Sequence, residues 1–199
     1  EIEERAEEVL VDVDHLAGQR PAQEVIGGGA ERCEGRRHRR VHRALAEAVG
    51  AGAGLRLYAV GDAVMGLSAL HEAGIRHGDF TPANVLVDRS GRGVLIDLGC
   101  ARPFGVTQHL AGTERYLAPE LLEGRAADGR SDLFAVGRTL ESLFGGTTRA
   151  PITVSRLIER LLRVDPGTRP VDCAEVLEAL GRTPRARGKS WAPARLLGR

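Results

Sequence analysis

Residues 77–99, HGDFTPANVLVDRSGRGVLIDLG, are the stretch that decides the fold of this chain. Asn84 follows Asp79 after five residues, and Asp97 follows it after eighteen. Two short apolar runs, Val-Leu-Val and Val-Leu-Ile, flank the turn-forming sequence Arg-Ser-Gly-Arg-Gly. Apolar runs separated by such a turn predict a β-hairpin. The stretch therefore predicts three oxygen-bearing side chains at the open end of one hairpin.

This spacing is typical of a kinase-type phosphoryl-transfer site. In such a site one carboxylate, here Asp79, orients and deprotonates a hydroxyl. Asn84 and Asp97 supply the hard oxygen ligands that Mg²⁺ prefers, and the metal is held on ATP. A structural Asp in a turn is the alternative for Asp79 alone. The offset to Asn84 and the hairpin leading into Asp97 argue against that alternative.

A second block, GTERYLAPE at residues 112–120, resembles the end of a Ser/Thr kinase activation segment. The chain is thus similar to the protein kinase family in the order and spacing of its motifs over residues 43–181. The resemblance implies that Thr113 faces the catalytic Asp and belongs to the acceptor platform. It also implies that Glu120 pairs internally with Arg169, and that Asp132 receives backbone amides of the catalytic loop.

The chain departs from the family pattern beside the catalytic Asp. Gly78 stands where the family usually has an Arg that reads a phosphate on the activation segment, so control by loop phosphorylation loses that receptor. Thr81 stands at the catalytic-loop position where Ser/Thr kinases carry a Lys that meets the γ-phosphate. The form His-Gly-Asp-Phe-Thr is closer to atypical and small-molecule kinases.

A larger departure lies upstream of the catalytic loop. The only lysine of the chain is Lys189, so no lysine precedes Asp79, and the triple glycine at 27–29 lacks the spacing of a nucleotide-binding Gly-rich loop. Glu8 lies at about the interval before Asp79 at which the family places the Glu of its αC helix. Because the chain starts with Glu and its only Met is Met65, we expect a small lobe that is missing or truncated in this sequence. A naturally degenerate kinase is the alternative.

The expected fold class is α+β and protein-kinase-like: a mainly helical large lobe with a short β-hairpin at the catalytic cleft and an incomplete small lobe. We divide the chain into a small-lobe remnant with an αC-like helix and a basic loop (1–42), a kinase large lobe (43–181) and a flexible basic tail (182–199). Apolar residues at three- and four-residue steps predict an amphipathic helix from Leu57 to near Gly74. Further apolar stripes predict helices beyond residue 116, with Asp172 as the N-cap of the last.

Composition excludes several classes of function. The formal net charge is +1, so no overall field favours nucleic acid. The three cysteines are scattered and odd in number, which favours reduced thiols and a cytoplasmic location. No apolar run approaches the ~20 residues of a membrane-spanning helix.

The sequence-based function is ATP-dependent phosphoryl transfer to Ser/Thr hydroxyls of protein substrates, with ATP and Mg²⁺ as cofactors. Asp79, Thr81 and Thr113 are the expected catalytic residues, and Asn84 and Asp97 the expected cofactor and metal ligands. A pseudokinase that binds or scaffolds is one alternative, because the phosphate-holding Lys is absent upstream. A small-molecule kinase of the aminoglycoside type is another, and the block at 112–120 argues against it.

Overall fold

The computed structural model describes residues 43–47, 52–88, 91–106 and 112–181. The expectations for residues 1–42 and 182–199, including an αC-like helix around Glu8 and a flexible tail, fall outside these described residues. Within them the fold is mainly helical, as the sequence predicts. It holds two small sheets, of which the sequence predicted only the β3–β4 hairpin.

Five α-helices and four 3₁₀ helices make up most of the described chain. The α-helices are α2 (Ala53–Glu72), α3 (Pro119–Leu122), α4 (Gly129–Phe144), α5 (Ile152–Leu161) and α6 (Cys173–Ala179). The 3₁₀ helices are η1 (Leu45–Glu47), η2 (Glu114–Tyr116), η3 (Thr147–Arg149) and η4 (Pro166–Thr168). The strands are β1 (Arg43–Ala44), β2 (Ile75–Arg76), β3 (Val85–Val87), β4 (Gly93–Leu95) and β5 (Arg102–Pro103).

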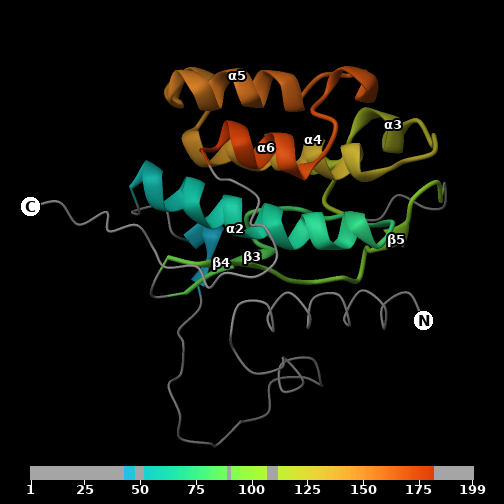
Figure 1. Ribbon diagram of the computed structural model, residues 1–199, viewed down its shortest axis with the longest axis horizontal. Coiled ribbons are helices and arrows are strands. Elements are labelled where there is room, and N and C mark those ends of the chain that lie inside the picture. Colours follow the sequence, from blue (N-terminus) through green and yellow to red (C-terminus); the bar gives the residue numbers. More distant parts are fainter. Residues whose placement is uncertain (1–42, 48–51, 89–90, 107–111, 182–199) are drawn as a thin grey trace, which may run out of the picture.

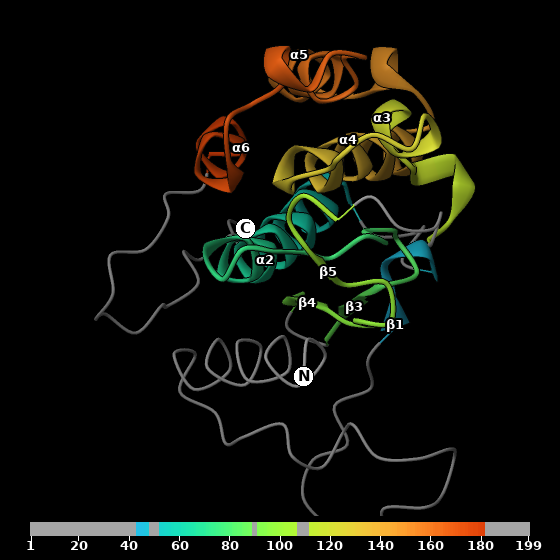
Figure 2. The same cartoon turned by 90° about the vertical axis from the view of Figure 1, so that its right-hand side faces the viewer.

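Helix α2 lies at the centre of the molecule, with β3 and β4 on one side and α4 and α6 on the other (Figures 1 and 2). The expected helix is therefore present, but it begins at Ala53 and is not simply amphipathic. Its buried residues spread over more than half of its circumference because it is covered on two sides: Ala59, Val60, Gly61, Ala63, Val64, Gly66, Leu67 and Leu70.

The hairpin predicted between the acidic positions is present as β3 and β4. The two strands pair antiparallel with Val85 opposite Leu95. Strand β1, which the sequence pattern did not predict, pairs with β3 and completes a three-stranded sheet. Strand β4 packs directly on the helix: a Cβ at Gly93 would lie 2.0 Å from the carbonyl oxygen of Ala59. Only glycine allows the sheet and α2 to approach so closely.

The helices after residue 116 bury the apolar stripes seen in the sequence. Leu133, Val136 and Leu140 of α4 join one core with residues of α2, α5 and α6. Asp172 caps α6 as predicted, with its side chain accepting a hydrogen bond from the backbone N–H of Glu175. In the described part of the chain, no helix combines the length and apolarity needed to cross a membrane.

Candidate active site

The loop that carries Asp79 is anchored to α4 by the side chain of Asp132. The two carboxylate oxygens of Asp132 accept hydrogen bonds from the backbone N–H groups of His77 and Gly78, each at 2.8 Å. His71, on α2, approaches the same carboxylate at 2.8 Å. Burial opposes ionisation of Asp132, but His71, His77 and the Gly78 N–H together outweigh it and hold the pKa of this carboxyl below its usual value. The amide contacts implied for Asp132 are thus present.

The imidazole of His77 ties this loop to the hairpin. His77 Nε2 lies 3.1 Å from the carbonyl oxygen of Ile96, and Nδ1 accepts a hydrogen bond from the backbone N–H of Asp79 at 3.2 Å. These partners require a neutral ring with its proton on Nε2. Burial lowers the pKa of His77, and the charge of Asp132 opposes this only in part. His77 therefore acts as an uncharged brace between the loop and the end of β4.

Asp79 lies where the loop, the hairpin and the segment before α3 meet. Its Oδ2 accepts a hydrogen bond from Asn84 Nδ2 at 2.7 Å, and the same amide donates to the Asp79 carbonyl oxygen at 2.9 Å. Its Oδ1 accepts a hydrogen bond from the backbone N–H of Thr113 at 2.8 Å. The structure thus brings together three of the residues chosen from the sequence. Thr113 contacts the carboxylate through its backbone.

The two other predicted site residues occupy different surroundings. Thr81 is buried, and its hydroxyl and carbonyl oxygens both accept from the backbone N–H of Asn84, so Thr81 holds the loop rather than facing solvent. Asp97 is exposed and has a φ of +68°, which is uncommon for a residue other than glycine. Its Oδ1 accepts a hydrogen bond from Gly99 N–H at 3.1 Å. The Ile96 N–H donates to the Asn84 carbonyl, which keeps Asp97 next to the loop.

Asn84 and Asp97 fit the requirements of Mg²⁺. The amide nitrogen of Asn84 is committed to Asp79, which leaves the amide oxygen as a free acceptor. The exposed carboxylate of Asp97 supplies a second hard oxygen. Across the described ranges, no three His, Cys, Asp or Glu side chains gather to form a metal cage. Two protein ligands are usual for Mg²⁺ bound with phosphates, since water and phosphate oxygens complete its octahedron.

The close packing of two glycines explains why the residue directly before Asp79 is not the arginine usual in the family. Gly78 has a φ of +81°, and a Cβ there would lie 2.5 Å from the carbonyl oxygen of Cys100. Gly112 has a φ of +110°, and its Cβ would lie 2.5 Å from the Gly78 carbonyl oxygen. Three segments of the site therefore touch through backbone alone. A side chain at position 78 does not fit this arrangement.

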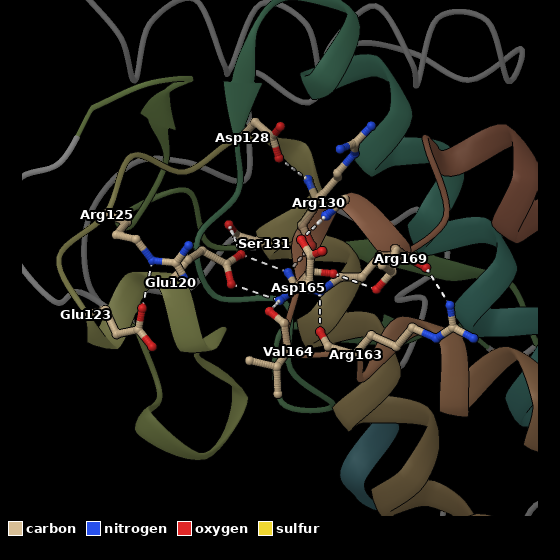
Figure 3. Close-up of polar contacts among 12 residues, drawn as sticks. Glu120, Glu123, Arg125, Asp128, Arg130, Ser131, Arg163, Val164, Asp165 and Arg169 are labelled. Atoms are coloured by element: carbon tan, nitrogen blue, oxygen red, sulfur yellow. Dashed lines mark hydrogen bonds and ion pairs between the residues drawn. The ribbon is translucent and has the colours of Figure 1, made fainter.

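The ion pair implied between Glu120 and Arg169 is present and buried (Figure 3). Arg169 Nη1 and Nη2 donate to the two Glu120 oxygens at 2.7 and 2.8 Å, and Ser131 Oγ donates to the same carboxylate at 2.7 Å. Burial opposes ionisation of Glu120, but these hydrogen bonds lower its pKa. The remaining guanidinium N–H groups donate to three backbone carbonyls, those of Arg130, Arg163 and Val164. The pair fixes α3, and with it the end of the Thr113 segment, against α4 and η4.

A hollow of about 340 Å³ opens beside Thr81 and Thr113. Its wall also includes η1, the start of α2 and the end of α4, through Leu45, Ala46, Arg56, Pro82, Ala83, Tyr116, Ser142 and Leu143. The amino-acid sequence did not predict this hollow, because the three residues of η1 show no recognisable pattern. No sequence pattern pointed to His71 as a partner of Asp132. The spacing of His77 and Asp79 could have indicated the role of His77 in holding the loop.

The helical fold with its hairpin and the loop that carries Asp79 is of the protein kinase class, and the comparison with family models agrees. The family model for the protein kinase domain matches residues 34–154. The chain belongs to the protein kinase family.

Its relatives include bacterial Ser/Thr kinases. It is 32% identical over 152 residues to the serine/threonine-protein kinase PknB of Mycolicibacterium smegmatis. The aligned region covers 68% of this chain and 24% of that protein. It is 43% identical over 88 residues to a probable serine/threonine-protein kinase of Streptomyces coelicolor, SCO3848, over 41% of this chain and 13% of that protein. The chain thus spans a quarter or less of the length of these curated relatives.

Proposed function

We propose that this chain carries the catalytic large lobe of an ATP-dependent Ser/Thr protein kinase. The observation that supports the proposal most directly is the Asp79 carboxylate, which lies between Asn84 Nδ2 and the Thr113 backbone N–H on a loop fixed by Asp132. Two hydrogen bonds orient the carboxylate. Each of its oxygens retains a second lone pair that can accept the proton of a substrate hydroxyl.

Each predicted site residue has a role in this proposal. Asp79 accepts the proton of the attacking hydroxyl as the hydroxyl oxygen bonds to the γ-phosphorus of ATP and the bond from this phosphorus to the β–γ bridging oxygen breaks, which releases ADP. Asn84 and Asp97 would hold Mg²⁺, and the ion would supply positive charge to offset that of the transferred phosphoryl group. Thr81 positions Asn84 through the loop backbone. The backbone of Thr113 fixes Asp79, so the segment after residue 112 forms one side of the acceptor platform.

A module that binds nucleotide without transferring phosphate is the second candidate. The observation that favours it is the sequence upstream of Asp79, which contains no lysine to hold the α- and β-phosphates. Arginine does not replace that lysine without rearrangement, because its guanidinium is larger and rigidly forked. We therefore expect the 199-residue chain to transfer phosphate slowly.

Separate measurements of binding and transfer distinguish the two candidates. Calorimetry with ATP and Mg²⁺ measures binding, and transfer of labelled γ-phosphate to a generic basic protein measures turnover. Asp97→Asn should weaken Mg²⁺-dependent ATP binding, whereas Asp79→Asn should leave binding intact and lower transfer by about 10²-fold or more. The exposed Glu123→Gln is the matched control and should change neither.

The possible outcomes divide cleanly. Transfer that is lost in Asp79→Asn supports the kinase. Mg²⁺-dependent binding with no transfer in the parent chain supports the binding module. A parent chain that does not bind ATP with Mg²⁺ contradicts both candidates.

A further inference from the structure

Cys173 is a buried thiol that the site described above does not use. It is the first residue of α6, which packs against α2 (Figure 1), and 2% of its surface is exposed. Its Sγ lies 3.5 Å from Nδ1 of His71 on α2, which is within hydrogen-bonding distance for sulfur. The two residues are 102 positions apart in the sequence. The contact therefore joins the last helix of the described residues to the central one.

The other ring nitrogen of His71 shows where the proton of the ring lies. Nε2 lies 2.8 Å from Oδ2 of Asp132, the carboxylate that anchors the loop of Asp79. Burial opposes ionisation of Asp132, but the surrounding donors lower its pKa, so the carboxylate is ionised and can only accept hydrogen bonds. Nε2 must therefore carry a proton and act as the donor. In a neutral imidazole, Nδ1 then has a lone pair that accepts a hydrogen bond.

Cys173 supplies the donor for this lone pair. Burial and three neighbouring carboxylates raise the pKa of the Cys173 thiol, so the thiol keeps its proton. The carboxylates belong to Asp132, Asp172 and Glu72. A protonated thiol can donate to the lone pair of Nδ1. Among the described residues, Cys173 Sγ is the polar partner of this nitrogen.

Packing also restricts the His71 ring. Phe104 meets the ring edge-on, with centroids 5.6 Å apart and an angle of 69° between the planes. A Cβ at Gly129, the first residue of α4, would lie 2.7 Å from Nδ1, so the backbone of α4 packs directly against this part of the ring. Packing thus restricts where the ring lies, and the hydrogen bonds determine which nitrogen carries the proton.

These contacts form a continuous polar path from α6 to the loop that carries Asp79. Cys173 donates to Nδ1 of His71, and Nε2 of His71 donates to Oδ2 of Asp132. The same Oδ2 accepts a hydrogen bond from the backbone N–H of His77, and the ring of His77 accepts one from the backbone N–H of Asp79. Without the thiol proton, the Nδ1 lone pair lacks a partner in a largely enclosed ring, and this penalty favours turning the ring toward solvent. Such a turn withdraws the Nε2 donor from Asp132.

We propose that Cys173 is a positioning residue for the catalytic loop, because its thiol proton holds the His71 ring in the orientation that donates from Nε2 to Asp132. The description of this loop as catalytic rests on the proposed function, whereas the path of hydrogen bonds is a property of the fold. A serine at position 173 can make the same contact, since a hydroxyl also donates, and an alanine cannot. Comparing these two substitutions separates the loss of a hydrogen bond from a change of side chain.

Nuclear magnetic resonance of the isotope-labelled 199-residue chain tests the proposal at about pH 7.5, where an unperturbed histidine is neutral. The nitrogen chemical shift distinguishes a protonated ring nitrogen from one with a lone pair, and it changes as the lone pair accepts a stronger hydrogen bond. We expect Nε2 of His71 to carry the proton and Nδ1 to accept. The Nδ1 shift should move toward the value of a free lone pair in Cys173→Ala. It should move away from that value in Cys173→Ser, because a hydroxyl is a stronger donor than a thiol.

Amide hydrogen exchange measures the consequence at the loop. The reference is the N–H of Leu157, a buried residue of α5, which reports on global stability. Relative to this reference, the N–H groups of His77 and Gly78 should exchange about tenfold faster in Cys173→Ala, because Asp132 holds them less firmly. In Cys173→Ser the exchange ratio should stay within about threefold of the parent value.

Val176→Ala is the matched control, because it removes buried volume from the same helix but no hydrogen-bonding group. It should leave the Nδ1 shift of His71 and the exchange ratio unchanged, even where it lowers global stability. If Cys173→Ala does not fold, the comparison of the parent with Cys173→Ser decides, and an Nδ1 shift that is the same in both overturns the proposal.

Three further results would overturn the proposal. The first is a parent ring in which Nδ1 of His71 carries the proton. The second is an Nδ1 shift that is the same in the parent and in Cys173→Ala. The third is an exchange ratio that changes as much in Val176→Ala as in Cys173→Ala. A parent chain that transfers no phosphate would contradict the proposed function and would leave all of these measurements unaffected.

Discussion

Arg169 and Arg76 are both buried arginines, but they differ in what surrounds them. Arg169 is 2% exposed, and its guanidinium donates to the Glu120 carboxylate and to three backbone carbonyls (Figure 3). Its five N–H donors are all used. Arg76 is 4% exposed, and its Nε is unpaired. Similar burial thus accompanies different numbers of hydrogen bonds.

The difference teaches that burial alone does not say whether a charge supports a fold. A buried charge whose partners are complete is strongly destabilising to disturb, because each partner loses its compensation. A buried charge with no partner costs free energy in the folded state, so its removal is tolerated. The same contrast separates Asp132, whose two oxygens face protein donors, from Asp97, which is exposed.

The largest effect is expected from substitutions that remove one partner of the buried ion pair between Glu120 and Arg169. Glu120→Ala and Arg169→Ala should each lower the free energy of unfolding by about 3–5 kcal/mol, because the remaining partner stays buried and uncompensated. The double variant should lose much less than the sum of the two. Urea unfolding measures all three. Strictly additive losses would show that the pair does not act as a unit.

Asp132→Asn tests the anchor of the catalytic loop. It should lower the free energy of unfolding by about 2–3 kcal/mol, because the amide leaves one of two buried N–H donors, that of His77 or Gly78, without an acceptor. Asp79→Asn is the matched change at the half-exposed end of the same loop, and it should cost less than about 1 kcal/mol. Urea unfolding of both variants gives the comparison, and equal losses would contradict it.

Because His77 is buried and uncharged, the free energy of unfolding should depend on pH. Its pKa is lowered in the folded state, so as pH falls below about 6.5 the unfolded chain binds a proton that the folded chain does not. The free energy of unfolding should therefore fall with pH between about 7.5 and 5.5, by up to ~1.4 kcal/mol per unit. Urea midpoints at three pH values should show a shallower slope for His77→Gln. An identical slope would assign the effect to other groups.

The smallest effect concerns an exposed ion pair. Arg160 Nη2 and Glu175 Oε1 form a salt bridge on the surface, and both side chains are about one third or more exposed. The backbone N–H of Val171 and then Arg160 lower the pKa of Glu175. Arg160→Ala should change the free energy of unfolding by less than about 1 kcal/mol, because solvent screens the pair. A loss as large as that of Arg169→Ala would remove the contrast between buried and exposed pairs.

Local patterns in the sequence predicted the hairpin, the long central helix and the cap at Asp172, because these depend on neighbouring residues. The resemblance supplied the long-range pair of Glu120 and Arg169. Strand β1 was missed because two residues carry no period, and α2 was described as amphipathic because sequence spacing does not reveal that both sides are covered. The contact of His71 with Asp132 depends on the packing of α2 against α4. The two residues are 61 positions apart in the sequence, so no local pattern encodes this contact.

The glycine junction at Gly78 and Gly112 makes the site intolerant of substitution in a particular way. Because the contact consists of backbone atoms, no choice of polar, charged or apolar side chain can tune it. Every replacement meets the same obstacle at its first carbon, and the positive φ adds to the penalty. In a saturation library we therefore expect these positions to reject all residues almost uniformly, whereas neighbouring Ala83, which is exposed, should accept many.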